Sequence, residues 1–186
     1  FFTPRWSPCT STTYQSRWGF RLMATDQLSM FGADEILKTK GGKAVSFNLS
    51  KSINGSQQSV FDHWLIPVFV GEWMFGPKIQ AEEIITLNNV VRKNGSFKYA
   101  VNRGGKKVVS SGEFVELDIP NRITLTWRET PKENLESQIT ANFLAEGSKT
   151  RLKLTVKLPA ELEPQKDTIR ELWSIRCKAL AERFSK

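Results

Sequence analysis

The chain has 186 residues, of which 39% are hydrophobic and 25% charged, and its formal net charge is +8. This composition is ordinary for a soluble globular protein, and the length suffices for one domain with its own core. The positive charge is dispersed, at +3 over residues 1–43 and +5 over the remainder, whereas nucleic-acid-binding proteins usually concentrate it on one face. No apolar run approaches the ~20 residues of a membrane-spanning helix. We therefore expect neither nucleic-acid binding nor a membrane span.

The N-terminal segment has a different composition from the rest of the chain. Residues 1–22 contain no acidic residue and carry three arginines among many Ser and Thr residues. This segment resembles an organelle transit peptide, or it is a tag or start-site artefact that precedes Met23, or it is a functional disordered tail. We therefore separate residues 1–43, as a leader, tag or disordered extension, from a domain at 44–186 that begins after Gly41-Gly42.

The two cysteines, Cys9 and Cys177, are too few and too far apart to predict a disulfide framework. We interpret Cys177 as a small packing residue of a helix. The chain therefore suits a reducing compartment, and we expect a cytoplasmic location. Organelle import follows only if residues 1–22 are a genuine leader.

The domain begins with a strand over residues 45–53, where apolar and polar residues alternate. Ser56 or a neighbour then caps a short helix that extends to Trp64, and Pro67 separates it from a second short helix over 68–74. Six more strands follow, bounded by turn residues such as the Gly104-Gly105 pair, and we predict them at 82–87, 96–102, 108–117, 122–128, 136–144 and 150–158.

The last predicted element is a helix that begins at Pro164 and ends near Phe184. Proline suits the first turn of a helix because its missing N–H is not needed there. The helix carries an apolar stripe at helical spacing, formed by Ile169, Trp173, Leu180 and Phe184 and widened by Leu172, Ile175 and Ala179.

This order of elements predicts an α+β helix-grip fold. Short hairpin connections favour an antiparallel sheet of six to seven strands, and its apolar face needs a cover. Only the C-terminal helix is long enough to supply that cover. A curved sheet around a helix leaves a cleft where small ligands bind.

The sequence shows no pattern of catalytic or metal-binding residues. His63 is the only histidine, so a His-based triad and a zinc site both lack partners. No glycine-rich phosphate-binding motif is present. Glu82 and Glu83 point to opposite faces of a strand, and we interpret them as solvated. We predict no catalytic residue, no metal site and no cofactor.

Aromatic residues are the most informative set. Each is interpreted as either a core residue or part of a cavity wall, and Trp73, Phe75 and Tyr99 are the strongest candidates for the wall because of their position or polar tip. Arg128 is a candidate charge at the rim. The full set of candidate ligand-binding residues is Trp64, Trp73, Phe75, Phe97, Tyr99, Phe114, Trp127, Arg128, Phe143 and Trp173.

Several strings in this order resemble the activator of heat-shock protein 90 ATPase homologue family, within the START-like (SRPBCC, Bet v 1-like) superfamily. The segment 59–64 resembles the family's "VFDAW" helix, and 71–77 resembles "xxWWGP" with Met74 at the second Trp. The most specific string is GEFVELDIPNRITLTWR at 112–128, which resembles "GEYLEIDPPERLVFTWR". Further similarities are found at 95–99, at 146–152 and at Trp173.

The resemblance implies a helix-grip fold for residues 44–186, but it leaves several functions open. The wider superfamily binds lipids, hormones, polyketides and other apolar ligands, and eukaryotic relatives bind the chaperone and stimulate its ATPase. Fold alone does not fix function. We expect a non-catalytic domain, a monomer or weak dimer, that binds a small apolar ligand in a cavity in contact with Trp73 or Tyr99. The alternatives are a co-chaperone-like protein-interaction module and, with less support, a cyclase or dehydratase.

Overall fold

The computed structural model describes residues 44–185, so the predictions for residues 1–43 lie outside the described part of the chain. Seven strands form one sheet in the order β1-β7-β6-β5-β4-β3-β2, and all neighbours are antiparallel. Their bounds are β1 Val45–Ile53, β2 Glu82–Asn89, β3 Ser96–Arg103, β4 Lys106–Asp118, β5 Arg122–Glu129, β6 Ser137–Glu146 and β7 Lys149–Leu158.

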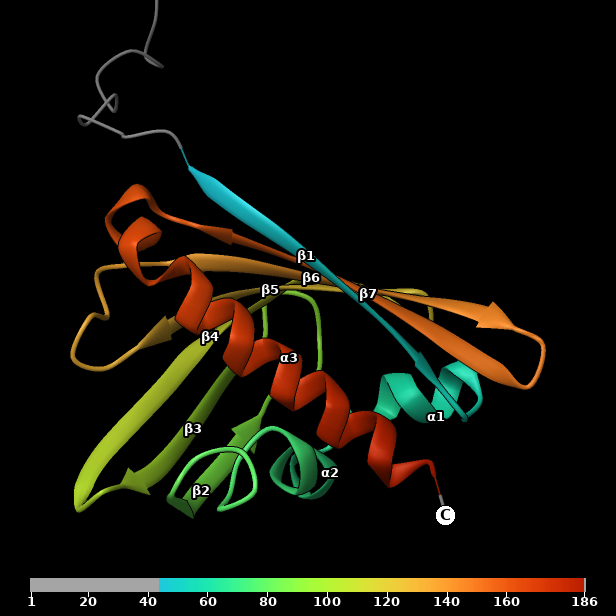
Figure 1. Cartoon of the computed structure of the whole chain (residues 1–186), viewed down its shortest axis with the longest axis horizontal. Helices are drawn as coiled ribbons and strands as arrows, with labels where there is room; N and C mark the ends of the chain where they lie inside the picture. The colour runs from blue at the N-terminus through green and yellow to red at the C-terminus, as the bar shows by residue number, and fades with distance from the viewer. Residues whose placement is uncertain (1–43, 186) are drawn as a thin grey trace, which may run out of the picture. The chain divides into compact units, whose positions relative to one another are not determined.

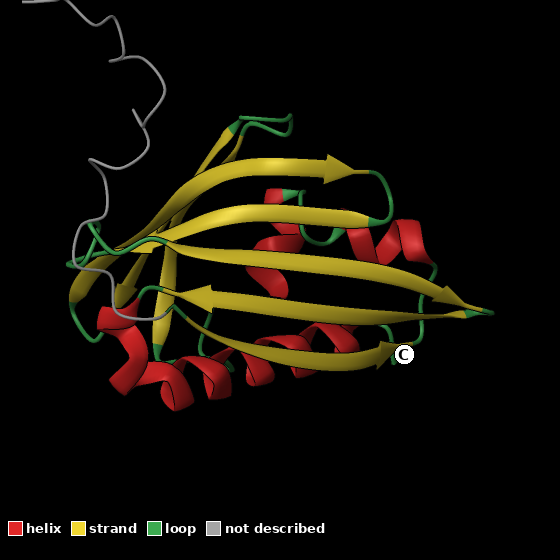
Figure 2. Ribbon diagram, turned by 90° about the horizontal axis from the view of Figure 1, so that it is seen from above, coloured by secondary structure: helices red, strands yellow, loops and turns green. Residues whose placement is uncertain are grey.

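The sheet curves around one long helix, α3 (Lys166–Arg183), which crosses its concave face (Figure 1). The strands lie side by side along the bend (Figure 2). Two short helices, α1 (Gln57–Asp62) and α2 (Pro67–Trp73), connect β1 to β2. The predicted helix-grip fold is confirmed, with all seven strands and both short helices.

Local sequence signals explain several element boundaries. The Ser56 hydroxyl accepts a hydrogen bond from the Ser59 N–H at 3.3 Å, which caps α1 as expected. The β3–β4 hairpin turns at Gly104 and Gly105, whose φ angles of +57° and +79° favour glycine. α1 is shorter than predicted, because it ends at Asp62 rather than at Trp64.

The start of the last helix was predicted at the wrong residue. Pro164 lies inside a 3-10 helix, η1 (Ala160–Gln165), and α3 begins only at Lys166. The tighter 3-10 turn brings Leu162 against the core before the α-helical stretch begins. Within residues 44–185, no helix is both long and apolar enough to cross a membrane.

The core lies between the sheet and the inner face of α3. Of the predicted stripe of α3, Ile169, Trp173, Ala179, Leu180 and Phe184 pack there, whereas Ile175 is 38% exposed and does not widen it. Arg176 takes a buried place on the inner face instead. Cys177 is a free, buried thiol in the part of the chain described, and burial raises its pKa to about 12. The packing role predicted for Cys177 is therefore confirmed.

Gly112 lies where β4 passes very close to β5. A Cβ atom at this position would meet the carbonyl oxygen of Thr126 and also lie 2.8 Å from the ring of Phe97. Since the backbone oxygen is fixed by the sheet, it has little freedom to move away. Glycine is therefore the residue that this part of the sheet requires.

We predict that Gly112→Ala destabilises the domain by about 3 kcal/mol, because overpacking forces the two strands apart. Urea unfolding followed by tryptophan fluorescence measures the loss. Gly147→Asn is the control, because Gly147 has φ +62° in a turn with nothing near its Cβ position, and Asn tolerates this conformation. The control is expected to cost less than about 1 kcal/mol. Equal stabilities of the two variants would contradict the prediction.

Candidate ligand-binding site

A cavity of about 280 Å³ lies between the strands β5, β6 and β7 and the first half of α3. η1 and the β5–β6 connection complete its wall. Ten of its sixteen lining residues are apolar. The apolar set is Trp127, Pro131, Leu135, Ile139, Val156, Leu158, Leu162, Ile169, Leu172 and Trp173, and the polar set is Glu129, Thr130, Lys132, Ser137, Gln165 and Arg176.

Two of the ten predicted site residues line this cavity, namely Trp127 and Trp173. Their rings meet edge to face, with centroids 5.6 Å apart. The other predicted aromatic residues are buried beside the cavity rather than on its wall, and they are Trp64, Trp73, Phe75, Phe97, Tyr99, Phe114 and Phe143.

The expectation that the cavity touches Trp73 or Tyr99 is wrong. The Trp73 indole donates a hydrogen bond to the carbonyl of His63 at 2.8 Å, and its ring packs on Trp64. Tyr99 stacks on Phe97 at 4.9 Å and meets Phe75 edge to face. Burial raises the pKa of Tyr99 above its usual value. These rings fill the space below α3 on the side of α2 and β3, so the cavity lies on the other side, next to β5–β7 and η1.

Arg128 also lies away from this cavity. Its side chain is half exposed and pairs with Glu136, so it does not supply a charge at the rim. The strand alternation explains this position, because Trp127 points inward and the next residue must point outward. Arg128 borders a separate hollow of about 270 Å³ together with residues of β3 and β4.

The sequence interpretation missed Arg176, which is 1% exposed and lines the cavity. Its Nε donates to the carbonyl of Met74 at 3.0 Å. Its guanidinium lies 4.9 Å from the ring centroid of Trp173, 5.4 Å from Phe75 and 5.6 Å from Trp127. The signal was present in the sequence, since Arg176 follows Trp173 by three residues and so shares the inner face of α3.

A second correction concerns Glu82, which was interpreted as solvated but is buried. Arg103 bridges two carboxylates, because its Nε donates to Glu82 and its Nη1 to Glu129, both at 3.0 Å. The Ser110 hydroxyl donates to the other Glu129 oxygen at 3.0 Å. Burial alone lowers the pKa of Arg103, but the two carboxylates more than offset this and raise it. Glu129 also lines the cavity, so the cluster borders the site.

His63 and Glu129 are both held by contacts with other parts of the protein. Within residues 44–185 no three His, Cys, Asp or Glu side chains are grouped to hold a metal ion. The His63 ring stacks on Phe69 and its Nδ1 lies 2.8 Å from the Ser59 carbonyl, in the α1–α2 region rather than on the cavity wall. Both oxygens of Glu129 already accept hydrogen bonds.

The curved sheet closed over a long helix, with a cavity between them, defines a helix-grip domain. Residues 54–185 match the family described as activator of Hsp90 ATPase homolog 1-like protein, and this match spans most of the chain. The chain therefore belongs to this family.

Solved structures from bacteria show the same fold. A protein of Chromobacterium violaceum has 18% identity and a TM-score of 0.65 over 76% of this chain and 98% of its own. A Mycobacterium smegmatis protein has 14% identity and a TM-score of 0.65, covering 75% and 90%. A Nitrosomonas europaea protein has 18% identity and a TM-score of 0.62, covering 74% and 92%. Similarity at these low identities shows a shared fold, and the function has to be argued from the residues of the site. A comparison with curated proteins found no match.

We predict that Arg103→Gln destabilises the domain by about 3–5 kcal/mol, because it leaves the Glu82 carboxylate buried without its partner. Arg128→Gln is the matched control, since it removes an exposed Arg–Glu pair and is expected to cost less than about 1 kcal/mol. Thermal and urea unfolding measure both. Similar losses in the two variants would show that the Arg103 cluster contributes no more than a surface ion pair.

Proposed function

We propose that this domain binds a small apolar ligand, without catalysis, in the cavity below the first half of α3. The observation that carries the proposal is the mostly apolar cavity between sheet and helix, with Trp127 and Trp173 on its wall. Ligand sites usually combine such a lining with a few polar groups that fix orientation. The volume of about 280 Å³ lies just below the usual range for such sites, which favours a small ligand.

The position of the cavity also supports the proposal. The other half of the space below α3 is filled by aromatic rings in mutual contact, such as Phe97 against both Tyr99 and Phe114. A protein interior is normally packed throughout, and a space of this size leaves its lining atoms without contacts. The residues that line the cavity therefore lack packing contacts, and a bound ligand would supply them.

We predict that the neutral probe N-phenyl-1-naphthylamine binds to the wild-type protein with increased fluorescence, and that Leu162→Trp weakens this binding at least tenfold. Leu162 is half-buried on the cavity wall, so a larger side chain fills the cavity from its rim. Fluorescence titration measures the affinity.

The control for this test is Leu144→Trp. Leu144 is 41% exposed on β6 and does not line the cavity, so the same substitution leaves the probe site intact. Absence of probe binding to the wild-type protein, or equal weakening in both variants, would refute the cavity as the ligand site.

A second candidate function is protein interaction, as an activator of a chaperone ATPase. The description of the family supports it, and so do exposed apolar side chains on and beside α2 and the edge strand β2, two elements in contact with each other (Figure 1). We call this group of residues the β2 edge patch, and it consists of Ile66, Val68, Ile84, Ile85, Val90 and Val91. Exposed apolar groups that gather in one region are typical of interaction sites. A chaperone partner requires a shared compartment, for which we propose the cytoplasm.

For this second candidate we predict that Ile85→Glu weakens binding to purified Hsp90 and lowers stimulation of its ATPase by at least tenfold. Ile85 is 54% exposed on an edge strand, so a charge there opposes apolar contact without disturbing the core. Leu144→Glu, on an exposed site of β6, is the control and should behave like wild type. A wild-type protein that neither binds the chaperone nor changes its ATPase rate would exclude this function.

A further inference from the structure

Arg176 is the one charged side chain of the cavity wall that is almost fully buried, among the residues that the structure describes. Burial of a charge is costly unless the charge is paired and hydrogen-bonded. Among the residues that the structure describes, Arg176 has a hydrogen-bond partner but no ion-pair partner, so we ask which ligand group could pair with it.

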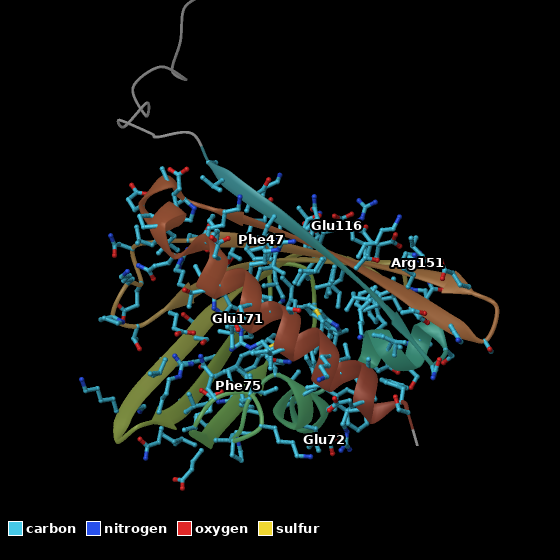
Figure 3. The ribbon with its side chains drawn as sticks, in the orientation of Figure 1. Phe47, Glu72, Phe75, Glu116, Arg151 and Glu171 are labelled. Carbon is cyan, nitrogen blue, oxygen red and sulfur yellow. The ribbon has the colours of Figure 1, made fainter. Side chains whose placement is uncertain are left out.

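The contacts of Arg176 satisfy only part of its hydrogen-bonding capacity. Nε donates to the Met74 carbonyl at 3.0 Å, whereas Nη2 is buried and has no partner. Phe75, which lies between α3 and the sheet (Figure 3), and the indoles of Trp127 and Trp173 surround the guanidinium. Aromatic faces attract a cation but do not accept its N–H groups as a carboxylate does.

The nearest carboxylates do not form an ion pair with Arg176. Both oxygens of Glu129 accept hydrogen bonds, from Arg103 and Ser110. Glu82 accepts from Arg103 through Oε2, and its Oε1 is buried without a partner. Glu129 and Glu82 still act on Arg176 through space, but burial outweighs them and lowers its pKa to about 10. The positive charge is thus only partly compensated by the protein.

We propose, on the basis of the ligand-binding function above, that the ligand is a small amphipathic carboxylic acid whose carboxylate meets Arg176 and whose apolar part lies along the aliphatic wall of the cavity. The planar guanidinium fork matches a carboxylate, Arg176 lines the cavity, and its buried Nη2 has no hydrogen-bond partner in the protein. A singly charged group fits better than a doubly charged phosphate, because Glu82 and Glu129 already place two negative charges nearby.

The test compares decanoate with 1-decanol, which has the same chain length and no charge, by isothermal titration calorimetry at pH 7.5. We expect the wild-type protein to bind decanoate roughly tenfold or more tightly than decanol, as a hydrogen bond to a charged group implies. Arg176→Met removes the guanidinium but keeps an apolar side chain, so decanol should still bind and the preference should disappear.

Arg170→Gln is the matched control, because it removes an arginine from the exposed side of the same helix. It should keep the preference for decanoate. If Arg176→Met does not fold, Arg176→Lys replaces it, since lysine keeps a charge but lacks the planar fork. A reduced preference is then expected, and an unchanged one overturns the proposal.

The outcomes separate this proposal from the function on which it rests. Equal binding of decanoate and decanol to the wild-type protein overturns the carboxylate proposal and leaves the apolar site in place. A preference that survives in Arg176→Met also overturns it, because the anion then binds elsewhere, such as at Lys132 on the rim. If neither compound nor the neutral naphthylamine probe binds, both proposals fail.

Discussion

The structure depends on the packing of one helix face against a curved sheet, and Trp173 is the centre of that contact. Its ring stacks on Trp64, with planes 7° apart, and meets Trp127 of β5 edge to face. The two rings belong to segments about sixty residues apart in sequence, one after α1 and the other in the sheet. A single helical side chain therefore joins the short-helix region, the sheet and α3. Arg183 at the end of α3 forms an ion pair at 2.6 Å with Glu72 of α2, which is labelled in Figure 3.

This contact divides the interior into two unequal halves. On the side of α2, β2 and β3, large aromatic rings contact one another, and they do not line the cavity. On the side of η1 and β5–β7, seven of the sixteen lining residues are Leu, Ile or Val, whose side chains are smaller than aromatic rings. The cavity thus results from the placement of the large aromatic side chains in one half of the interior and of smaller side chains in the other half. Trp127 and Trp173 form the boundary between the packed half and the open half, which explains why they alone among the predicted aromatics line it.

The sequence was sufficient for the fold because the relevant signals are local. Alternation defines the strands, Gly104-Gly105 defines a hairpin, and Ser56 defines a helix start. The location of the cavity is a different kind of problem, because it depends on the summed volume of side chains from distant segments. Trp73 and Trp127 are the same type of residue, and it is the side chains around each of them that decide which one lines the cavity. The burial of Glu82 was missed for the same reason, since its partner Arg103 is brought beside it only by the pairing of β2 with β3.

Arg176 connects the cavity with the segment that carries the β2 edge patch. Its Nε holds the carbonyl of Met74, which immediately follows α2, and α2 contributes Val68 to that patch. A ligand that pairs with the guanidinium would therefore also strengthen the position of α2. Such a shared contact links two sites energetically only if the connecting element has two arrangements that a ligand distinguishes. The structure shows one arrangement, with Nε already engaged and another guanidinium nitrogen unpartnered. Neither proposal therefore requires the other.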